Sequence, residues 1–391
     1  MKILVFLTRF PYPLNKGDKL RAFYQIKELS KANDIYLFSL TDKEPKEEDK
    51  KILTNYCKDI HIEKLSWLSR LFSVFVNLFT YLPLQTAFFT TKRAKKHFLK
   101  YYYNVKPESS YFQFVRSAEY AKLIKSYKVL DYQDCLSMNM LRRSEISSFF
   151  VKRIFLLEAK RLRNYEKQMF SLFDKLTIIT QTDRDFIFSE RKDEIQIIEN
   201  GVDESFFDYK VLKDKRFDII FSGNMSYKPN GVAADFLVNK IMPLVWQKRP
   251  QTNLVIAGSN PTSTIKNYAK DYPQKIFVTG WVDDMREYYA YSKIFIAPMQ
   301  IGTGLQNKLL EAMAMRLPCI TTPLANNALK SLPNKQILVG DTAKELADNI
   351  IKLLEDDSFA EEVASNGNDF IRQNYSWQSS CEKLQGILQH K

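Results

Sequence analysis

The chain has few of the side chains from which disulfide frameworks, zinc centres and histidine-based triads are built. It contains four cysteines and three histidines. The cysteines lie far apart and form no C-x-x-C pair, which argues against a zinc site and favours a reducing compartment. With so few histidines, a nucleophilic triad has little support. The residues concerned are Cys57, Cys135, Cys319, Cys381, His61, His97 and His390.

A long apolar run is missing from the start of the sequence. The apolar segment Met1–Leu7 is too short for a signal peptide, and Arg9 interrupts the chain two residues beyond it. We therefore expect a first buried strand and a cytoplasmic protein.

Charge is distributed unevenly along the chain. Residues 1–200 hold 36 Lys/Arg and 24 Asp/Glu, whereas residues 201–391 hold 22 and 21, so almost all of the net charge of +13 is N-terminal. Such an excess attracts a polyanion, which would be a nucleic acid, an anionic membrane or a phosphorylated substrate. A generally lysine-rich proteome is the alternative explanation.

The 391 residues suit two domains of about 200 residues each, and the pattern of the second half supports this division. Short apolar runs alternate there with amphipathic segments, which is typical of a parallel sheet covered by helices. The expected strands are Phe217–Ser222, Leu254–Gly258, Ile276–Gly280, Ile294–Pro298, Cys319–Thr322 and Ile337–Val339, and the expected helices are 230–248, 284–291, 307–316 and 343–355.

The first half shows the same alternation less clearly. Its expected strands are Ile3–Thr8, Ile35–Leu40, Lys128–Asp131 and Leu176–Thr180, and its expected helices are 17–32 and 144–173. The fold class predicted is α/β, with two Rossmann-like doubly wound domains facing a cleft and ligands at the carboxyl ends of the strands.

The most informative segment is the loop and helix within Ala297–Met315. Gly302 and Gly304 let backbone N–H groups approach a ligand closely, and the helix expected from about Gln306 adds positive potential. Lys308 brings a full charge, and Glu311 lies on the same helical face. Together they suit a diphosphate and the two hydroxyls of a ribose, although a plain surface ion pair would have the same spacing.

Several segments resemble the retaining GT-B glycosyltransferases of family 4, also called glycosyl transferases group 1. The segment Gly302–Met315 resembles the donor-site signature of that family, Asn200–Asp203 its interdomain turn, and Phe221–Asn230 the opening of its second domain. Phe10–Pro13 with Gly17–Arg21 is similar to a first-domain loop of the subgroup found in exopolysaccharide gene clusters. The likeness is strong over 217–325 and loose over 41–125.

The resemblance implies roles for individual residues. Glu311 would be the second glutamate of the family's E-x7-E pair and contact the ribose, and Lys308 would bind the diphosphate. The first glutamate falls at Thr303, which is a departure from the family pattern that bears on how the donor sugar is held. The donor-binding residues expected are Gly223, Asn224, Val282, Gly302, Thr303, Gly304, Leu305, Gln306, Lys308 and Glu311, and the catalytic residues expected are Lys308, Glu311 and Asp134.

Two further groups in the first half are candidates for acceptor or phosphate contacts. Gly17, Lys19 and Arg21 come after the first expected strand, and a plain turn with a helix start is the alternative. Asp131 and Asp134 end a later strand, where a carboxylate either faces the cleft or caps a loop.

No cofactor and no metal are expected. The D-x-D pattern Asp183-Arg184-Asp185 begins a helix, where Asp is favoured as a cap, and its central arginine repels a divalent cation. Asp283-Asp284 is interpreted in the same way.

A basic and aromatic region spans residues 66–103. Its apolar run within Trp67–Phe89 is shorter than the roughly 20 residues needed to span a bilayer. We expect it to lie at the inner membrane surface, with the lysines of Lys92–Lys96 against anionic lipid. A core helix with a solvated basic face is the alternative.

The resulting prediction is a glycosyltransferase that moves a sugar from a UDP- or GDP-type donor to a lipid-linked glycan, without a metal and with retention, in bacterial surface polysaccharide assembly. Residues 1–200 would bind the acceptor, 201–370 the nucleotide-sugar, and a helix in 371–391 would pack back on the first domain. An epimerase or phosphorylase on the same fold, a non-catalytic partner subunit and a basic nucleic-acid-binding protein are the alternatives. The last would leave the segment Gly302–Glu311 without a role, so we expect no nucleic-acid partner.

Overall fold

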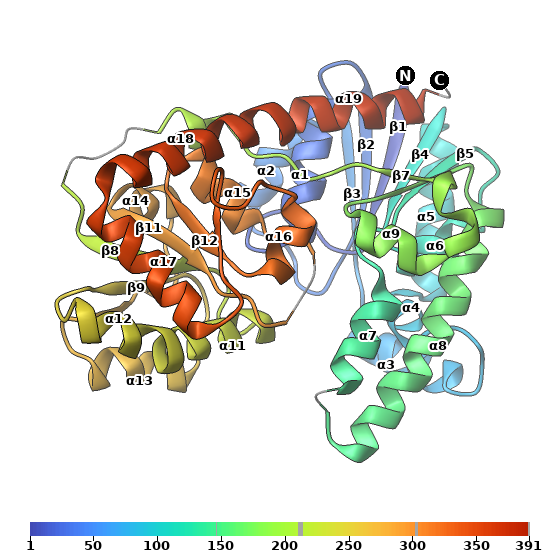
Figure 1. Cartoon of the computed structure of the whole chain (residues 1–391). Coiled ribbons are helices and arrows are strands. Elements are labelled where there is room, and N and C mark those ends of the chain that lie inside the picture. The colour runs from blue at the N-terminus through green and yellow to red at the C-terminus, as the bar shows by residue number, and fades with distance from the viewer. Residues whose placement is uncertain (146, 210–213, 302–303, 390–391) are drawn as a thin grey trace. The chain divides into compact units, whose positions relative to one another are not determined.

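The chain forms two compact units, each built on its own sheet (Figure 1). The computed structural model describes residues 1–145, 147–209, 214–301 and 304–389. The first unit comprises Met1–Glu199 together with Trp377–Lys391, and the second comprises Asn200–Ser376. The second unit therefore extends six residues beyond the limit of 370 expected from the sequence, because the chain re-enters the first unit only at Trp377.

The first unit contains a seven-stranded parallel sheet in the order β3-β2-β1-β4-β5-β6-β7. The strands expected at 3–8, 35–40, 128–131 and 176–180 are confirmed as β1, β2, β5 and β6, whereas β3, β4 and β7 were not predicted. The strands are β1 (Lys2–Leu7), β2 (Asp34–Thr41), β3 (Asp59–Lys64), β4 (Ser109–Gln113), β5 (Tyr127–Asp131), β6 (Lys175–Ile178) and β7 (Ile195–Ile197).

Helices cover both faces of this sheet, so successive side chains of β1 enter two different cores. Ile3 and Val5 pack with α1 and α19, while Leu4 and Phe6 pack with α5 and α8. The helices of the unit are α1 (Gly17–Leu29), α2 (Glu47–Thr54), α3 (Trp67–Asn77), α4 (Leu84–Phe89), α5 (Lys92–Val105), α6 (Ala118–Ala121), α7 (Leu136–Glu145), α8 (Phe149–Leu172), α9 (Gln181–Ile187) and α19 (Trp377–Leu388), with short 3-10 turns η1 (Val115–Ser117) and η2 (Ser189–Glu194).

The second unit contains a six-stranded parallel sheet in the order β10-β9-β8-β11-β12-β13. All six strands expected from the sequence are confirmed to within two residues at each end. They are β8 (Phe217–Ser222), β9 (Leu254–Ala257), β10 (Ile276–Val278), β11 (Ser292–Ala297), β12 (Cys319–Thr321) and β13 (Leu338–Val339).

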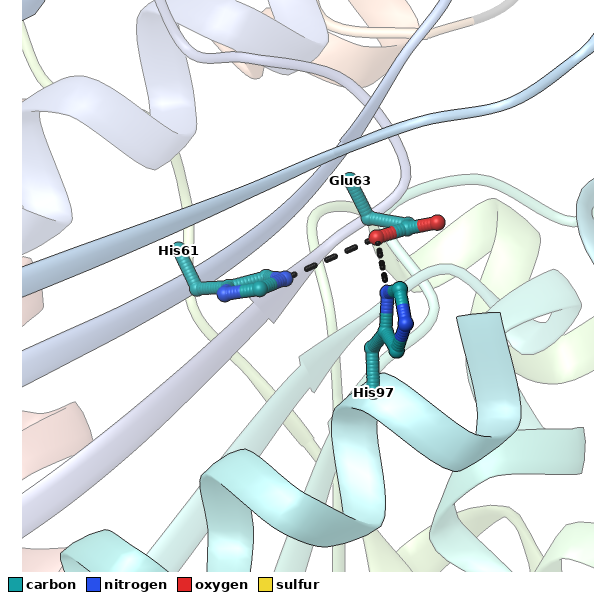
Figure 2. Close-up of side chains that lie close together, drawn as sticks. All are labelled: His61, Glu63 and His97. Carbon is teal, nitrogen blue, oxygen red and sulfur yellow. Dashed lines mark hydrogen bonds and ion pairs between the residues drawn. The ribbon is translucent and has the colours of Figure 1, made fainter. Parts of the chain in front are cut away.

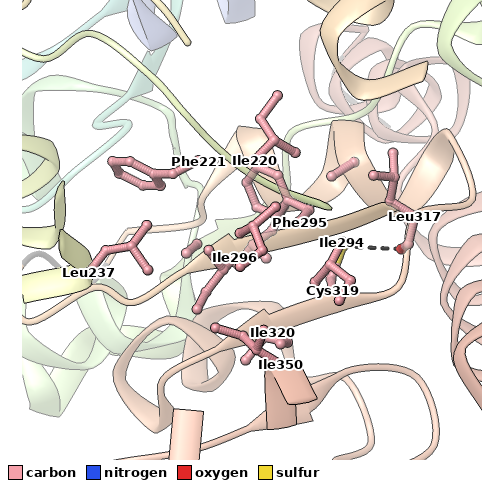
Figure 3. Packing of buried hydrophobic residues seen from close by; sticks show 14 of the residues in the cluster. Ile220, Phe221, Leu237, Ile294, Phe295, Ile296, Leu317, Cys319, Ile320 and Ile350 are labelled. Atoms are coloured by element: carbon pink, nitrogen blue, oxygen red, sulfur yellow. Dashed lines mark hydrogen bonds between the residues drawn. The ribbon is translucent and has the colours of Figure 1, made fainter. Parts of the chain in front are cut away.

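The core of the second unit lies around β8, β11 and β12. Ile220, Phe295 and Ile320 are all fully buried there, and helix residues such as Leu237 and Ile350 close over them (Figure 3). The helices are α10 (Glu204–Phe207), α11 (Lys228–Phe236), α12 (Met242–Lys248), α13 (Ser263–Asp271), α14 (Met285–Ala290), α15 (Asn307–Ala314), α16 (Pro323–Leu329), α17 (Ala343–Glu355) and α18 (Asp357–Asn374).

Two helices that the sequence predicts as continuous are divided in the structure. The segment 144–173 contains the end of α7 and the whole of α8, with the break around Ser147 and Ser148. The segment 230–248 is interrupted by the π-helical turn η3 (Leu237–Ile241), directly before Pro243, whose nitrogen carries no hydrogen and cannot continue the α-helical pattern.

In each sheet the strand order reverses once, and this determines where a ligand can sit. From β1 the chain proceeds outward to β2 and β3 and then returns to β4, on the other side of β1. From β8 it proceeds to β9 and β10 and then returns to β11. The loops that follow β1 and β4, and those that follow β8 and β11, therefore diverge at a crevice, which is the preferred ligand position in such sheets.

Candidate functional site

Glycines bring the loops after β8, β9 and β10 close together at the carboxyl edge of the second sheet. Gly223 has a φ of +150°, and a Cβ there would lie 2.7 Å from Asn230 Nδ2. At Gly258 a Cβ would lie 2.0 Å from the carbonyl oxygen of Gly223. A side chain at Gly258 would collide with backbone, and one at Gly223 would displace the Asn230 amide, so glycine allows these loops to approach each other closely.

The loop after β11 leads into α15, the helix predicted to bear the site. Gly302 and Thr303 lie outside the described residues. Beyond them, Gln306 Nε2 donates to the carbonyl of Gly304. Gln306 is the N-cap residue of α15, and its side chain makes no capping hydrogen bond to the described residues of that helix. In the first turn, Leu309 N–H donates to the carbonyl of Gln306, whereas the N–H groups of Asn307 and Lys308 make no hydrogen bond to a described residue and are available to an anion.

Lys308 extends from the first turn of α15 toward the glycine loop. Its Nζ donates to Asn230 Oδ1 at 2.5 Å and lies 4.7 Å from the centre of the Phe221 ring. Asn230 Nδ2 donates in turn to the carbonyl of Asn224. A Cβ on Gly223 would come within 3.4 Å of this ammonium group, so the Lys308 charge faces the backbone of that loop.

Glu311 lies one turn further along α15, and its carboxylate accepts a hydrogen bond from a fully buried tyrosine. Tyr289 Oη lies 3.2 Å from Glu311 Oε2 and 2.9 Å from Ser222 Oγ. Ser222 ends β8 and Tyr289 belongs to α14, so three elements fix the orientation of one carboxylate. The second carboxylate oxygen makes no hydrogen bond to another described residue and can accept a ligand hydroxyl.

Burial moves both charged groups toward neutrality. It lowers the pKa of Lys308 from 10.5 to about 7, although Glu311 opposes the shift, and it raises the pKa of Glu311 from 4.5 to about 7, although Tyr289 and Lys308 oppose it. Both side chains keep some exposure to solvent. The arrangement therefore suits a ligand that replaces water around them and supplies negative charge to Lys308.

Of the other residues expected to bind the donor, Asn224 and Leu305 make contacts within the protein itself. Asn224 Oδ1 accepts from the backbone and hydroxyl of Ser226, so its side chain shapes the turn after β8. Leu305 packs against the core of the second unit, and Val282 lies half-buried in the loop between β10 and α14. Lys228, at the start of α11, is exposed.

In the first unit, the loops after β1 and β4 and the start of α1 line a small hollow that is open to solvent. It is lined by Leu7, Thr8, Arg9, Asp18, Lys19, Gln113 and Phe114. Gly17 is the exposed first residue of α1, and burial lowers the pKa of Lys19, whose Nζ donates to the carbonyl of Tyr12. Lys19 thus lines this hollow, and its phosphate contact stays a prediction.

Arg21 is placed differently from the expectation. Its side chain is completely buried, and Nε lies 2.6 Å from Asp131 Oδ2, which also accepts from Tyr111. The ion pair fastens α1 to β5, because an uncompensated charge at this depth would be very unfavourable. Arg21 therefore acts as an anchor inside the unit rather than as a phosphate contact at its surface.

Asp134 follows β5 at the same edge of the first sheet. Burial raises the pKa of Asp134 to about 7, with further contributions from the nearby carboxylates Asp183 and Asp131. A carboxyl group of this kind can accept a hydroxyl proton near neutral pH. Asp131, the other candidate, is fully engaged with Arg21 and Tyr111.

The two aspartate pairs that resemble metal motifs begin helices, as predicted. Asp284 caps α14 by accepting from the Arg286 N–H. At α9 the cap is Thr180, whose hydroxyl accepts from the Asp183 N–H and donates to the Asp183 carboxylate. The cap residue at α9 thus differs from the aspartate expected.

The basic aromatic region 66–103 divides into an exposed and a buried part. Helix α3 leaves Trp67, Leu68, Phe72 and Phe75 between 62% and 76% exposed, so it is no core helix of this chain. Helices α4 and α5, in contrast, pack into the first unit through residues such as Phe89 and Phe98.

A second apolar segment, which the sequence interpretation missed, adjoins α3. The start of α8 exposes Phe149, Phe150, Ile154 and Leu157, each by more than half. Contacts join the two segments: Arg161 of α8 donates to the carbonyl of Leu78, and Glu158 accepts from the N–H groups of Leu84 and Gln85. We call the exposed apolar residues of α3, the following loop and the start of α8 the apolar surface. Its members are Trp67, Leu68, Leu71, Phe72, Phe75, Val76, Leu78, Phe79, Tyr81, Phe149, Phe150, Val151, Ile154, Leu156 and Leu157.

No helix of the described residues combines the length and the apolar character that crossing a bilayer requires.

Asn230 and Tyr289 are the site residues that sequence reasoning missed. Asn230 ends the segment that resembles the opening of the family's second domain, and Tyr289 lies in an expected helix. Neither carries a signal in the sequence that it touches Lys308 or Glu311. Both contacts join residues far apart in the sequence and depend on the packing of α11 and α14 against the sheet.

The chain is similar to several known proteins. Residues 216–356 match the family described as glycosyl transferases group 1. An uncharacterized 44.6 kDa protein in the cps region of Klebsiella pneumoniae is 26% identical over 382 residues, covering 96% of each chain. A GDP-mannose-dependent monoacylated alpha-(1-6)-phosphatidylinositol monomannoside mannosyltransferase of Corynebacterium glutamicum is 29% identical over 38% of this chain and 42% of its own length.

The solved structures that are similar over nearly the whole chain include HepE and WaaG. HepE of Anabaena in complex with UDP-glucose has a TM-score of 0.67 and 14% identity, covering all of both chains. WaaG, a glycosyltransferase involved in lipopolysaccharide biosynthesis, has a TM-score of 0.69 and 12% identity over 98% of this chain and 99% of its own. At this level of identity the likeness establishes the GT-B fold.

Proposed function

We propose that this chain transfers a glycosyl unit from a UDP- or GDP-sugar to a lipid-linked glycan. The premise of this proposal is that the chain is a glycosyltransferase of group 1 with the GT-B fold. The observation that carries the donor assignment is the position of Lys308. Its ammonium group lies against the glycine loop after β8, at the start of a helix whose N-terminus attracts anions.

In the proposed reaction, Lys308 and the first turn of α15 stabilise the charge that develops on the leaving diphosphate. Glu311, oriented by Tyr289, accepts the 2′ and 3′ hydroxyls of the ribose. The acceptor oxygen forms a bond to the anomeric carbon as the bond from that carbon to the diphosphate breaks, the hydroxyl proton passes to the leaving diphosphate, and the configuration at the sugar is retained. We assign to Asp134 a contact with the reacting hydroxyl, and no metal ion to the donor site.

The relatives indicate the class of the donor, but they differ in its base and its sugar. HepE was solved with UDP-glucose, and the Corynebacterium relative uses GDP-mannose. Both donors present the diphosphate and the ribose for which the second unit offers Lys308 and Glu311. A nucleoside diphosphate-sugar is thus the donor class we propose.

The proposal of a lipid-linked acceptor rests on the apolar surface. Exposed basic residues, including Lys152, Arg153, Lys160 and Arg163, accompany its apolar side chains on α8. Aromatic rings beside lysine and arginine suit the headgroup region of an anionic membrane. We propose that this surface places the first unit on the inner face of the membrane, where surface polysaccharide is assembled on lipid carriers.

The donor assignment is tested by calorimetric titration with UDP, GDP, ADP and CMP. At least one nucleoside diphosphate should bind, and Lys308→Ala and Glu311→Ala should weaken it at least about 10-fold while leaving the circular dichroism spectrum unchanged. Lys228→Ala, which removes an exposed lysine from the start of α11, is the matched control. Unaltered affinity in both Lys308 and Glu311 variants would show that the site has been misassigned.

The reaction class is tested with nucleotide-sugar and a membrane extract. A transferase releases the nucleoside diphosphate only when acceptor is present. An epimerase leaves the nucleotide-sugar intact as an isomer, and a phosphorylase requires inorganic phosphate or a sugar phosphate. Acceptor-independent conversion would overturn the transferase assignment.

Membrane contact is tested by sedimentation with phosphatidylglycerol vesicles and with phosphatidylcholine vesicles. Replacing Phe72 and Phe75 by serine should reduce binding to the anionic vesicles, because both rings are more than 60% exposed. Leu332→Ser, which removes a 55% exposed apolar side chain from the second unit, should leave it unchanged. Equal loss in both variants would refute the role of the apolar surface.

A further inference from the structure

The geometry points to a binding site for a zinc-type divalent cation in the first unit, formed by His61, Glu63 and His97. It stands on different residues from the donor site and does not depend on the proposed function. Among the described residues, this is the one group of three or more His, Cys, Asp or Glu side chains whose ligand atoms converge, all within 4.8 Å of one another (Figure 2).

The fold brings the three side chains together from two elements. His61 and Glu63 are two residues apart on β3, so they lie on the same face of the sheet. His97 lies on α5, which packs on that face through Phe98 and Tyr101. Figure 2 shows both imidazole rings directed at the same oxygen of Glu63. β3 is the edge strand of its sheet, so the group lies at the border of the unit.

The distances are close to those around a bound ion. Glu63 Oε2 lies 2.7 Å from His97 Nδ1 and 3.6 Å from His61 Nε2. Ligand atoms held at about 2.0–2.1 Å around a tetrahedral zinc ion are about 3.3 Å from one another. All three ligand atoms lie within 4.8 Å of one another, so side-chain shifts of about 1 Å would convert the hydrogen-bonded group into a coordination triangle.

One ligand atom lacks a hydrogen-bond partner among the described residues. His61 Nε2 is buried and makes no hydrogen bond to any described residue. The ring is nevertheless fixed, because it stacks on Phe38 with centroids 4.7 Å apart. A buried polar atom without a partner is unfavourable, and a coordinated cation would satisfy it.

The carboxylate of Glu63 is also oriented to bind a cation. Its side chain is 4% exposed, and Arg93 Nε lies 3.3 Å from Oε1, the oxygen that does not face the histidines. Carboxylates that bind metals are commonly oriented by such an outer partner. Arg93 itself is 76% exposed, so it can follow any small movement of the carboxylate.

The ligand set determines the class of cation and the coordination. Two imidazoles and one carboxylate suit zinc and related transition metals, and they disfavour Mg²⁺ and Ca²⁺, which prefer oxygen ligands. The two histidine side chains are 35% and 36% exposed, which leaves room for water at the fourth position. The bound ion would fasten α5 to the edge strand β3, and so support the segment from which the apolar surface extends.

The test uses the full chain, stripped with a chelator and titrated with Zn²⁺ in competition with a chromogenic chelator. We expect one ion per chain, bound at least about 100-fold more weakly by His61→Gln and His97→Gln. Arg93→Gln should weaken binding about 10- to 100-fold. His390→Gln, which replaces the third histidine of the chain, is the matched control.

A Co²⁺ spectrum distinguishes the proposed ligands from cysteines. Nitrogen and oxygen ligands give d–d bands without the strong thiolate charge-transfer band, and titration with Mg²⁺ should give no binding. The proposal is overturned if Zn²⁺ fails to bind, if His390→Gln weakens binding as much as the cluster variants do, or if the Co²⁺ spectrum shows thiolate. Should the histidine variants not fold, Arg93→Gln decides, since an exposed side chain is replaced: unchanged affinity there overturns the proposal.

Discussion

Replacing Glu311 by glutamine should stabilise the empty protein while weakening its affinity for a nucleoside diphosphate. Burial raises the pKa of Glu311 from 4.5 to about 7, so the folded protein holds a carboxylate in surroundings that disfavour its charge. Glutamine has the same shape and no charge, and its amide oxygen can still accept from Tyr289.

The pH dependence follows from the direction of the shift. Unfolded wild type loses this proton near pH 4.5, whereas the folded state keeps it to about pH 7, so the wild-type free energy of unfolding falls as pH rises through this window. At about 1.36 kcal/mol per unit, the full penalty above pH 7 is at most about 3 kcal/mol. Because Lys308 loses its neighbouring charge, part of the gain is cancelled, and we expect about 1–3 kcal/mol at pH 8 and almost none at pH 5.

Binding should change in the opposite direction. Two hydrogen bonds to a carboxylate become two to a neutral amide, a loss of about 2–3 kcal/mol, or about 30- to 150-fold in Kd. Scanning calorimetry at pH 5 and pH 8 measures the first effect, at about 2–4 °C per kcal/mol for a unit of this size. Titration with UDP or GDP measures the second.

The reasoning would be refuted if Glu311→Gln lowered the melting temperature at pH 8, because the carboxylate would then contribute net stability. It would also be refuted if the melting temperature difference from wild type were the same at pH 5 and pH 8.

Three further predictions address the contacts around the site and the anchor of the first unit. Tyr289→Phe removes a donor that lowers the pKa of Glu311, so that pKa should rise further and the pH above which nucleotide binds should increase, as measured by titration at several pH values. Gly223→Ala places a Cβ 2.7 Å from Asn230 Nδ2 and should weaken nucleotide binding at least about 10-fold, whereas Gly386→Ala, with no atom within 4 Å of its Cβ, should stabilise α19 by about 0.5–1 kcal/mol. Arg21→Met leaves Asp131 charged and buried, and denaturant unfolding should show a loss of about 3–5 kcal/mol.

Much of the fold could be predicted because the second sheet is buried on both sides. The central parts of its strands, such as Ile219–Phe221 and Ile294–Ala297, are continuously apolar and flanked by helical patterns, which leaves little ambiguity. β3 was missed because Asp59–Lys64 is an edge strand with a charged, half-exposed pattern, and β7 because three residues carry almost no periodicity. Whether a strand lies at the edge of a sheet is decided by tertiary packing, so the sequence indicates it only weakly.

The site shows the same division. Lys308 and Glu311 share one short segment, so helical spacing alone places them on one face. Asn230 and Tyr289 reach them only after the sheet has formed. The sequence contains no sign that His61 and His97 meet, since their contact depends on β3 taking the edge position under α5.

Helix α19 has a consequence for the order in which the protein can be completed during synthesis. Leu384, Ile387 and Leu388 fill a core shared with β1 and α1, and Trp377 stacks on Tyr24 of α1 with ring centroids 5.2 Å apart. These residues leave the ribosome only after the whole second unit. Until then one face of the nascent N-terminal sheet is covered only in part, by α1 and α2, and exposed apolar surface of this kind favours aggregation of a newborn chain.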